Sequence, residues 1–263
     1  MVISSIILAL LQALAEFLPI SSSGHLVLAH DILNLSPEVF NISFDIILHF
    51  GSLFALLIFF RKDILAIISG VFKKDKVYIK IFFNIIFATM PAIFIGYFFG
   101  DLIENNLRNT WVVIFNLVFF GLIFIFAEKI SKMKNEIEDL SIKKSFLIGA
   151  AQTIALIPGV SRSGITIISG LLLGLKREAS AKFAFLVAIP AISLASAKGI
   201  KDIIGLKESF FSFDVYLIGF ITSFIASFIT IKYFLKYIKT NSFKPFVYYR
   251  FVLAFIMIVY LTF

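Results

Sequence analysis

Two short stretches of this sequence hold groups that could bind and hydrolyse a phosphate compound, although both lie among apolar segments. The first, QALAEFLPISSSGH, contains Gln12, Glu16, three serines and His25. The second, PGVSRSGIT, contains Arg162, two serines and Thr166. Carboxylates and imidazoles transfer protons, a serine hydroxyl can act as a nucleophile, and a guanidinium binds two phosphate oxygens at once.

Ionised groups at membrane depth are costly, so Glu16 and Arg162 need an explanation. An arginine at the centre of a membrane helix costs about 2.5–3.5 kcal/mol on insertion scales. Its partner is either Glu16 alone, in a salt bridge, or a phosphate bound together with hydroxyl groups and a helix N-terminus near Gly164. Gln12 lies four residues before Glu16 and shares its helix face. A contact between Gln12 and a neighbouring helix explains that residue equally well.

The serine cluster after Pro19 predicts a tight turn, and at least one of its serines should cap the following helix. His25 is either a proton-transfer group or a core histidine bonded to backbone. His30 and His49 have no such neighbours, so we expect both to be ordinary core histidines.

The composition predicts an integral membrane protein. Of the 263 residues, 60% are hydrophobic and 15% are charged, and the mean hydropathy is +1.02. A soluble domain could not bury so much apolar surface. The formal net charge is +8, but the basic residues lie between apolar runs, which favours loops facing anionic lipid and not a nucleic-acid partner. The chain has no cysteine, which excludes disulfides and thiolate nucleophiles.

Six apolar runs are long enough to cross a bilayer core of about 30 Å. They are residues 42–60, 77–99, 111–127, 182–197, 213–231 and 247–263.

Two further runs are broken, and each half is too short to span. One consists of residues 2–18 and 26–35, interrupted at Pro19, and the other of residues 146–157 and 164–175, interrupted at Pro158 and Gly159. We interpret both as re-entrant helix hairpins whose tips are buried in protein. The first run lacks a basic leader and contains Glu16, so we expect it to remain in the folded protein and not to act as a signal peptide.

The basic residues predict the orientation. Loops 61–76, 128–145, 175–182 and 232–246 carry 17 of the 24 Lys and Arg residues, whereas loops 31–41, 100–110 and 198–212 carry 4. The basic side is expected to be cytoplasmic, which places both termini outside.

An offset of 140 residues aligns the two broken runs with each other. The identical pairs are Gln12 with Gln152, Ala15 with Ala155, Ser21 with Ser161, Ser23 with Ser163, and Gly24 with Gly164. We therefore expect one all-α polytopic membrane domain over residues 1–263, with six transmembrane helices and two re-entrant hairpins. Its halves, about 1–127 and 146–263, form an inverted-topology repeat joined by a charged cytoplasmic loop at 128–145, and such repeats place a site where the hairpin tips meet.

Both stretches resemble the signature motifs of the undecaprenyl-diphosphate phosphatase family, the bacitracin-resistance membrane proteins. Gln12 and Glu16 fill its (E/Q)xxxE pattern, Pro158 to Thr166 fill PGxSRSxxT, and His25 fills the histidine that follows the first motif. The likeness covers essentially the whole chain. Gln12 replaces a glutamate found in many members, which places any scheme that needs two acids in question.

The resemblance implies hydrolysis of undecaprenyl diphosphate to undecaprenyl phosphate and phosphate at the outer face of the bacterial cytoplasmic membrane, which recycles the lipid carrier for peptidoglycan synthesis. It implies a divalent cation, Mg²⁺ or Ca²⁺, held here by Glu16 and diphosphate oxygens. Arg162 would clamp phosphate, Ser22 or water would attack, Glu16 would act as base or metal ligand, and His25 would donate or activate a proton. The expected substrate-binding residues are Gln12, Ser21, Ser23, Gly159, Ser161, Ser163 and Thr166.

Two other functions compete with this interpretation. Acid-phosphatase-like lipid phosphatases share a similar SGH, but their second histidine would fall on Thr166, so their mechanism does not transfer. An inverted-repeat transporter or flippase for an anionic lipid or small anion would also use Arg162, but would have less need of Glu16, His25 and the serines. The expected partners are undecaprenyl diphosphate and the lipid bilayer, no nucleic acid is expected, and a homodimer is left open.

Overall fold

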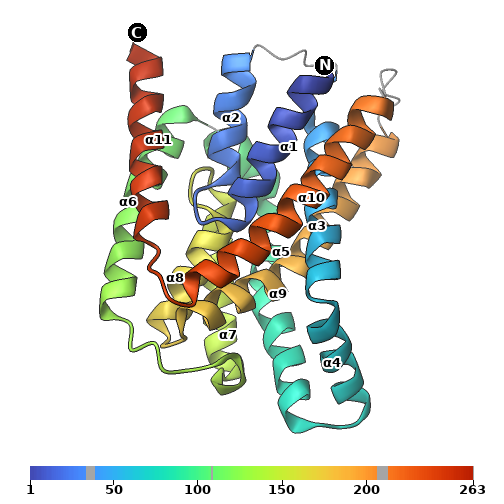
Figure 1. Cartoon of the computed structure of the whole chain (residues 1–263), viewed down its shortest axis with the longest axis vertical. Coiled ribbons are helices and arrows are strands. Elements are labelled where there is room, and N and C mark those ends of the chain that lie inside the picture. The colour runs from blue at the N-terminus through green and yellow to red at the C-terminus, as the bar shows by residue number, and fades with distance from the viewer. Residues whose placement is uncertain (34–38, 108, 206–212, 263) are drawn as a thin grey trace.

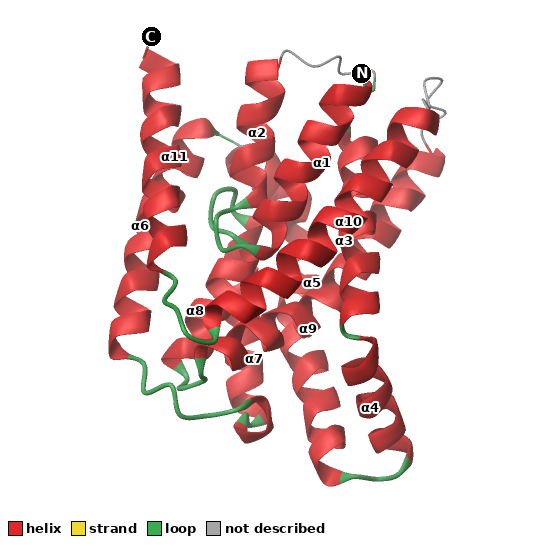
Figure 2. Ribbon diagram, viewed as in Figure 1, coloured by secondary structure: helices red, strands yellow, loops and turns green. Residues whose placement is uncertain are grey.

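The computed structural model describes residues 1–33, 39–107, 109–205 and 213–262, and these residues are almost entirely helical (Figures 1 and 2). The only strand-like pairing among them is a single bridge between Asn135 and Leu175. In chain order the elements are α1 (Val2–Phe17), α2 (Ser22–Leu33), α3 (Ile42–Phe59), α4 (Arg61–Phe72), α5 (Lys76–Leu107), α6 (Thr110–Ile130), η1 (Ile137–Asp139), α7 (Ile142–Gln152), η2 (Thr153–Leu156), α8 (Arg162–Leu172), α9 (Arg177–Gly205), α10 (Phe213–Ile238) and α11 (Lys244–Thr262).

The prediction of an all-α polytopic membrane protein is confirmed. Within the described residues, five helices are long and apolar enough to cross a membrane. Their spanning segments are Lys76–Gly100, Thr110–Ile130, Arg177–Ala197, Phe213–Ile238 and Lys244–Thr262. The pair α3 and α4 makes a sixth span if it is counted as one, although it is bent by 65°.

Helix α4 corrects the prediction of a loop at 61–76. Asp63 lies in its first turn, where the positive end of the helix dipole favours a carboxylate. Asp63 also accepts a hydrogen bond of 2.5 Å from the Lys182 side chain on α9. These charges occur directly after an apolar helix, so the sequence suggests a loop, but the segment still forms a helix at a changed angle.

The four helices beside the two breaks are each too short to cross a bilayer. At 1.5 Å per residue, the 16 residues of α1 extend about 24 Å and the 12 residues of α2 about 18 Å, while α7 and α8 have 11 residues each. The first pair is interrupted around Pro19 and the second around Pro158, as the sequence predicts. Both second helices begin earlier than predicted, at Ser22 and Arg162, and the end of the predicted run 26–35 lies outside the described residues.

The helices pack in related pairs that bring the two breaks together. Helix α1 packs on α10, and α7 packs on α5, while α3 contacts α9 and α6 contacts α11. Helix α9 is the most enclosed of the spanning helices. Figure 2 shows the loops of both breaks side by side at mid-height of the molecule, between the α6–α11 pair and α10.

Two glycines allow the closest helix contacts. A Cβ atom on Gly51 of α3 would lie 2.7 Å from the carbonyl oxygen of Phe220 on α10. A Cβ atom on Gly149 of α7 would collide with the backbone of Ala88 on α5. Small residues at membrane helix interfaces allow such backbone contact.

We expect Gly149→Ala to lower the free energy of unfolding by about 1–3 kcal/mol, because the added methyl group has no room. Gly100→Ala is the matched control. It is also helical, but nothing lies within 4 Å of its added Cβ, so the substitution should be neutral or stabilising by up to about 1 kcal/mol. Unfolding in detergent, followed by circular dichroism, measures both. Equal melting temperatures for the two variants would contradict the close contact of α7 with α5.

Candidate active site

The turns that precede α2 and α8 have the same backbone and the same cap. Ser21 and Ser161 both have φ of 76°, a left-handed conformation that is rare for residues other than glycine. The Ser21 hydroxyl accepts a hydrogen bond from the Gly24 backbone N–H at 3.4 Å, and Ser161 accepts one from Gly164 at 3.1 Å. In each turn the serine therefore caps the first turn of the helix that follows.

Hydroxyl groups also join the two turns to each other. Ser23 Oγ accepts a hydrogen bond from the Gly159 backbone N–H at 3.3 Å, and Ser163 Oγ donates one to the Leu18 carbonyl oxygen at 3.2 Å. The two tips are thus in direct contact.

Arg250 on α11 holds both tips against α6. Its side chain is fully buried and donates hydrogen bonds of 2.9–3.4 Å to five backbone carbonyl oxygens. These oxygens belong to Pro19 of the first tip, Gly159 and Val160 of the second, and Asn116 and Leu117 of α6. The sequence analysis does not predict this role, although a lone arginine inside the last apolar run is a usable signal.

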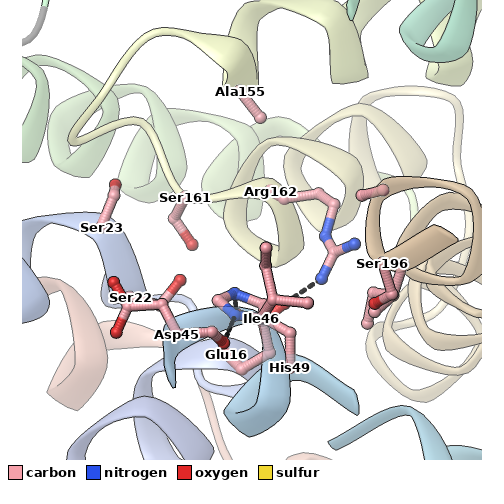
Figure 3. A pocket seen from close by; sticks show the side chains of 12 residues that line it. Glu16, Ser22, Ser23, Asp45, Ile46, His49, Ala155, Ser161, Arg162 and Ser196 are labelled. Atoms are coloured by element: carbon pink, nitrogen blue, oxygen red, sulfur yellow. Dashed lines mark hydrogen bonds and ion pairs between the residues drawn. The ribbon is translucent and has the colours of Figure 1, made fainter. Parts of the chain in front are cut away.

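A cavity of about 360 Å³ lies where the tips face α3 and α9 (Figure 3). Residues from the two breaks and from these two helices line it. They are Glu16, Ser22, Ser23, Asp45, Ile46, His49, Ala155, Ser161, Arg162, Ile192, Ala195 and Ser196.

Glu16 is the central carboxylate of this cavity. Its Oε1 accepts a hydrogen bond from Nη2 of Arg162, and its Oε2 lies 3.4 Å from Nε2 of His49. Ser22 lines the same cavity. The salt bridge, one of the two partners that the sequence offered for Arg162, therefore forms, and the candidate nucleophile and the candidate base line one cavity.

His49 corrects the prediction of an ordinary core histidine. Its Nδ1–H does donate to the Asp45 backbone carbonyl at 2.8 Å, but its other nitrogen faces Glu16 across the cavity wall. With Nδ1 already a donor, Nε2 can donate to Glu16 only when the ring is protonated. Asp45 and His49 are four residues apart in an apolar run, the same signal that singled out Gln12 and Glu16.

His25 is not among the residues that line the cavity, contrary to our expectation. Its Nδ1–H donates to the Ser21 carbonyl oxygen at 2.7 Å, and its Nε2 accepts from the Tyr249 hydroxyl at 2.8 Å. The two rings are also stacked, with centroids 5.5 Å apart. His25 lies one turn into α2. Its ring bonds to Tyr249 of α11 on one side and to the backbone of the serine turn on the other. The side chain of His30 lies outside the described residues.

The expected substrate-binding residues divide into three groups, of which two lie at the turns. Ser23 and Ser161 line the cavity. Ser21, Gly159 and Ser163 build and join the turns instead, and Gly159 has φ of 91°, where a side chain would be strained.

Gln12 and Thr166 are buried away from the cavity. Gln12 Oε1 accepts hydrogen bonds from the hydroxyl groups of Ser52 at 3.1 Å and Ser223 at 3.0 Å, which ties α1 to α3 and α10. Thr166 donates to the Arg162 carbonyl at 2.8 Å, within its own helix. The contact with neighbouring helices explains Gln12.

The cavity could supply part of a divalent cation site. Two carboxylates, Glu16 and Asp45, line it. No group of three or more His, Asp or Glu side chains suited to a metal occurs in the described part of the chain. Mg²⁺ commonly takes one or two carboxylates and completes its shell with substrate phosphates and water. The donor set therefore fits a cation that binds together with a phosphorylated substrate.

Comparison with known proteins identifies the family. The model of the bacitracin resistance protein BacA family matches residues 5–256. The chain belongs to this family. Curated members include the undecaprenyl-diphosphatase of Rubrobacter xylanophilus, 37% identical over 96% of this chain and 95% of its own length. The undecaprenyl-diphosphatase 1 of Pseudoalteromonas translucida is 38% identical over 99% of both chains, and the undecaprenyl-diphosphatase of Aliivibrio salmonicida is 41% identical over 94% of this chain and 93% of its own.

We expect Arg250→Lys to lower the free energy of unfolding by about 3–5 kcal/mol, since a lysine cannot reach five carbonyl oxygens from one position. The matched control is Arg61→Lys on α4. Arg61 is exposed and makes one backbone hydrogen bond, to Ile58, so its replacement should cost under about 0.5 kcal/mol. Thermal unfolding in detergent compares them, and a stable Arg250→Lys protein would show that the tips hold together without this residue.

Proposed function

We propose that this protein hydrolyses undecaprenyl diphosphate to undecaprenyl phosphate and inorganic phosphate. The observation that carries the proposal is one cavity in which Glu16, Ser22 and Arg162 meet, in a chain of the BacA family whose curated relatives are named undecaprenyl-diphosphatase. The activity recycles the lipid carrier of cell-wall synthesis and makes the protein a bacitracin-resistance factor.

Phosphate binding falls to Arg162 and the two helix N-termini. The guanidinium can bind two phosphate oxygens with its planar fork. The N-termini of α2 and α8 add the positive ends of their helix dipoles, which favour an anion. Ser23 and Ser161 line the same space and supply hydroxyl donors. When substrate binds, Arg162 exchanges part of its contact with Glu16 for phosphate oxygens. Glu16 keeps its contact with His49 and becomes a stronger base.

The chemical step begins with attack on the terminal phosphorus by Ser22 Oγ or by water. Glu16, which lines the same cavity as Ser22, takes the proton of the attacking group. The bond from phosphorus to the bridging oxygen breaks, and undecaprenyl phosphate leaves. If Ser22 is the nucleophile, water then hydrolyses the phosphoserine, releasing phosphate and restoring the hydroxyl. His25 sets the shape of the serine turn through Ser21 and so positions Ser22.

A divalent cation, Mg²⁺ or Ca²⁺, completes the proposed site. Glu16 would hold it, and Asp45, which lines the same cavity, is the second available carboxylate. Such an ion would neutralise charge on the diphosphate oxygens as the bond breaks.

The proposed architecture is a single domain of two inverted repeats, over about 1–127 and 146–263, with six spans and two re-entrant hairpins. The matching φ, cap and hydroxyl pair at Ser21 and Ser161 support it, as do the matching helix pairs α1–α10 and α7–α5. In the bacterial cytoplasmic membrane both termini would be outside, and the cavity would open to that side. The homodimer and the lack of a nucleic-acid partner stay predictions from the sequence.

Arg162→Lys tests the function directly. Charge is kept, so the lysine can still pair with Glu16 and the protein should fold. The planar fork is lost, and positioning and charge stabilisation carry most of phosphoryl transfer. Phosphate release from a prenyl diphosphate by purified protein should fall by roughly 30- to 1,000-fold, equivalent to about 2–4 kcal/mol of barrier. Arg61→Lys should keep full activity. Release within about threefold of the parent would make Arg162 a structural cation.

His49 should act by positioning Glu16. His49→Gln retains an N–H donor for the carboxylate and should keep activity within about fivefold. His49→Ala removes the donor, and kcat should fall by about 10- to 100-fold, the range for a lost hydrogen bond to a charged group, while KM changes less. Steady-state kinetics on both variants decide this, and equal losses would mean that the imidazole itself is required.

Orientation can be tested because the chain has no cysteine. Both chain ends lie at the end of the molecule opposite the α4–α5 turn and α7 in Figure 1. A single cysteine at the exposed position Asn106, near the end of α5, should react with a membrane-impermeant maleimide on intact cells. One at Lys143 on α7 should react only after permeabilisation. The reverse pattern would invert the proposed topology.

A further inference from the structure

Ser196 on α9 is a buried hydroxyl that faces the cavity without a partner. The residue is 3% exposed, and its Oγ has no hydrogen-bond partner within the part of the chain that the structure describes. It nevertheless lines the cavity, together with Ile192 and Ala195 of the same helix. A buried hydroxyl left unpaired is unfavourable, so its position at the cavity wall suggests that a ligand completes it.

Ser193, a nearby serine on the same helix, makes the backbone hydrogen bond that Ser196 lacks. A serine inside a helix commonly donates to the carbonyl four residues earlier. Ser193, less than one turn away, does so to Ile189 at 2.7 Å. Ser196 makes no such bond within its own helix, so its hydroxyl hydrogen is unused within the described residues.

The cavity has hydroxyl groups at two ends, with Arg162 between them. In Figure 3, Ser22, Ser23 and Ser161 lie on one side of the view and Ser196 lies on the other. The Arg162 guanidinium, paired with Glu16, occupies the space between these sides.

We propose that Ser196 binds the phosphoryl group that carries the prenyl chain, so that the two ends of the cavity take the two phosphoryl groups of a diphosphate. This inference rests on the proposed function. The phosphoryl group under attack must lie beside Ser22 and Glu16, at the serine end. The other then lies toward α9, where Ile192 and Ala195 give the wall an apolar surface suited to the start of a prenyl chain. The Arg162 fork can contact both groups. Ser196 is thereby a residue that selects a diphosphate over a monophosphate.

The test compares Ser196→Ala with Ser193→Ala, a matched change on the same helix away from the cavity. Hydrolysis of farnesyl diphosphate is followed by the farnesyl phosphate formed, with methylenediphosphonate or inorganic phosphate as competitor. For Ser196→Ala we expect the KM and the Ki of methylenediphosphonate to rise about tenfold, the size of one hydrogen bond to a charged group. The Ki of inorganic phosphate should stay within about twofold, and Ser193→Ala should match the parent throughout.

Two results would overturn the assignment. Equal rises in both Ki values would place Ser196 on the phosphoryl group under attack, and no rise in either would remove it from the site. If Ser196→Ala does not fold, Ser196→Cys replaces it, since the thiol has similar size and is a weak donor. A parent protein that hydrolyses no prenyl diphosphate would refute the proposed function instead. Thermal stabilisation by methylenediphosphonate, compared between parent and variant, would then still test Ser196.

Discussion

Five backbone carbonyl oxygens that converge on one buried arginine are the constraint on which this structure depends. Two helix breaks in the interior of a membrane protein leave polar backbone groups without helical partners, and each such group that stays unpaired away from water is costly. Arg250 pairs with carbonyls of both tips and of α6, so one side chain satisfies both breaks and fixes their distance. Removing Arg250 would leave these carbonyls unpaired, which is why its role is structural although it lies next to the site.

Charge balance explains how an ion pair can also be a binding site. Glu16 lies between Arg162 and His49, and Ser22 lines the same cavity. Without substrate, the pair offsets the cost of holding an arginine at this depth. A diphosphate is a stronger partner for the guanidinium than one carboxylate, because it offers more oxygens for the planar fork. The same arrangement therefore stabilises the empty protein and is replaced in part when substrate arrives.

Comparing positions 140 residues apart distinguishes residues that build the two turns from residues to which we assign chemistry. Ser21 and Ser161 share a strained φ and a capping bond, and Ser23 and Ser163 each join one tip to the other. These identical positions build the two turns. The positions to which we assign chemistry differ from their counterparts: Glu16 corresponds to Leu156, Ser22 to Arg162, and His49 to Ile189. Two similar turns thus supply a matching frame, and unlike side chains on that frame provide the proposed acid–base group on one side and the proposed phosphate-binding group on the other.

The sequence by itself determined the membrane class, the positions of the apolar helices, the two breaks, and the meeting of Glu16 with Arg162. Hydropathy, proline and glycine positions, and the cost of buried charge are local properties, and they suffice for these points. Tertiary structure decided the rest. His49 lines the cavity and His25 does not, the reverse of the prediction. The reason is that packing sets the rotation of α3 and α2, and this rotation determines which face of each helix meets the cavity. Gln12 connects neighbouring helices by hydrogen bonds, Arg250 holds the two tips, and Ser196 lines the cavity. Each of these roles depends on groups more than a hundred residues away in the sequence, and no local pattern predicts that such groups lie close together.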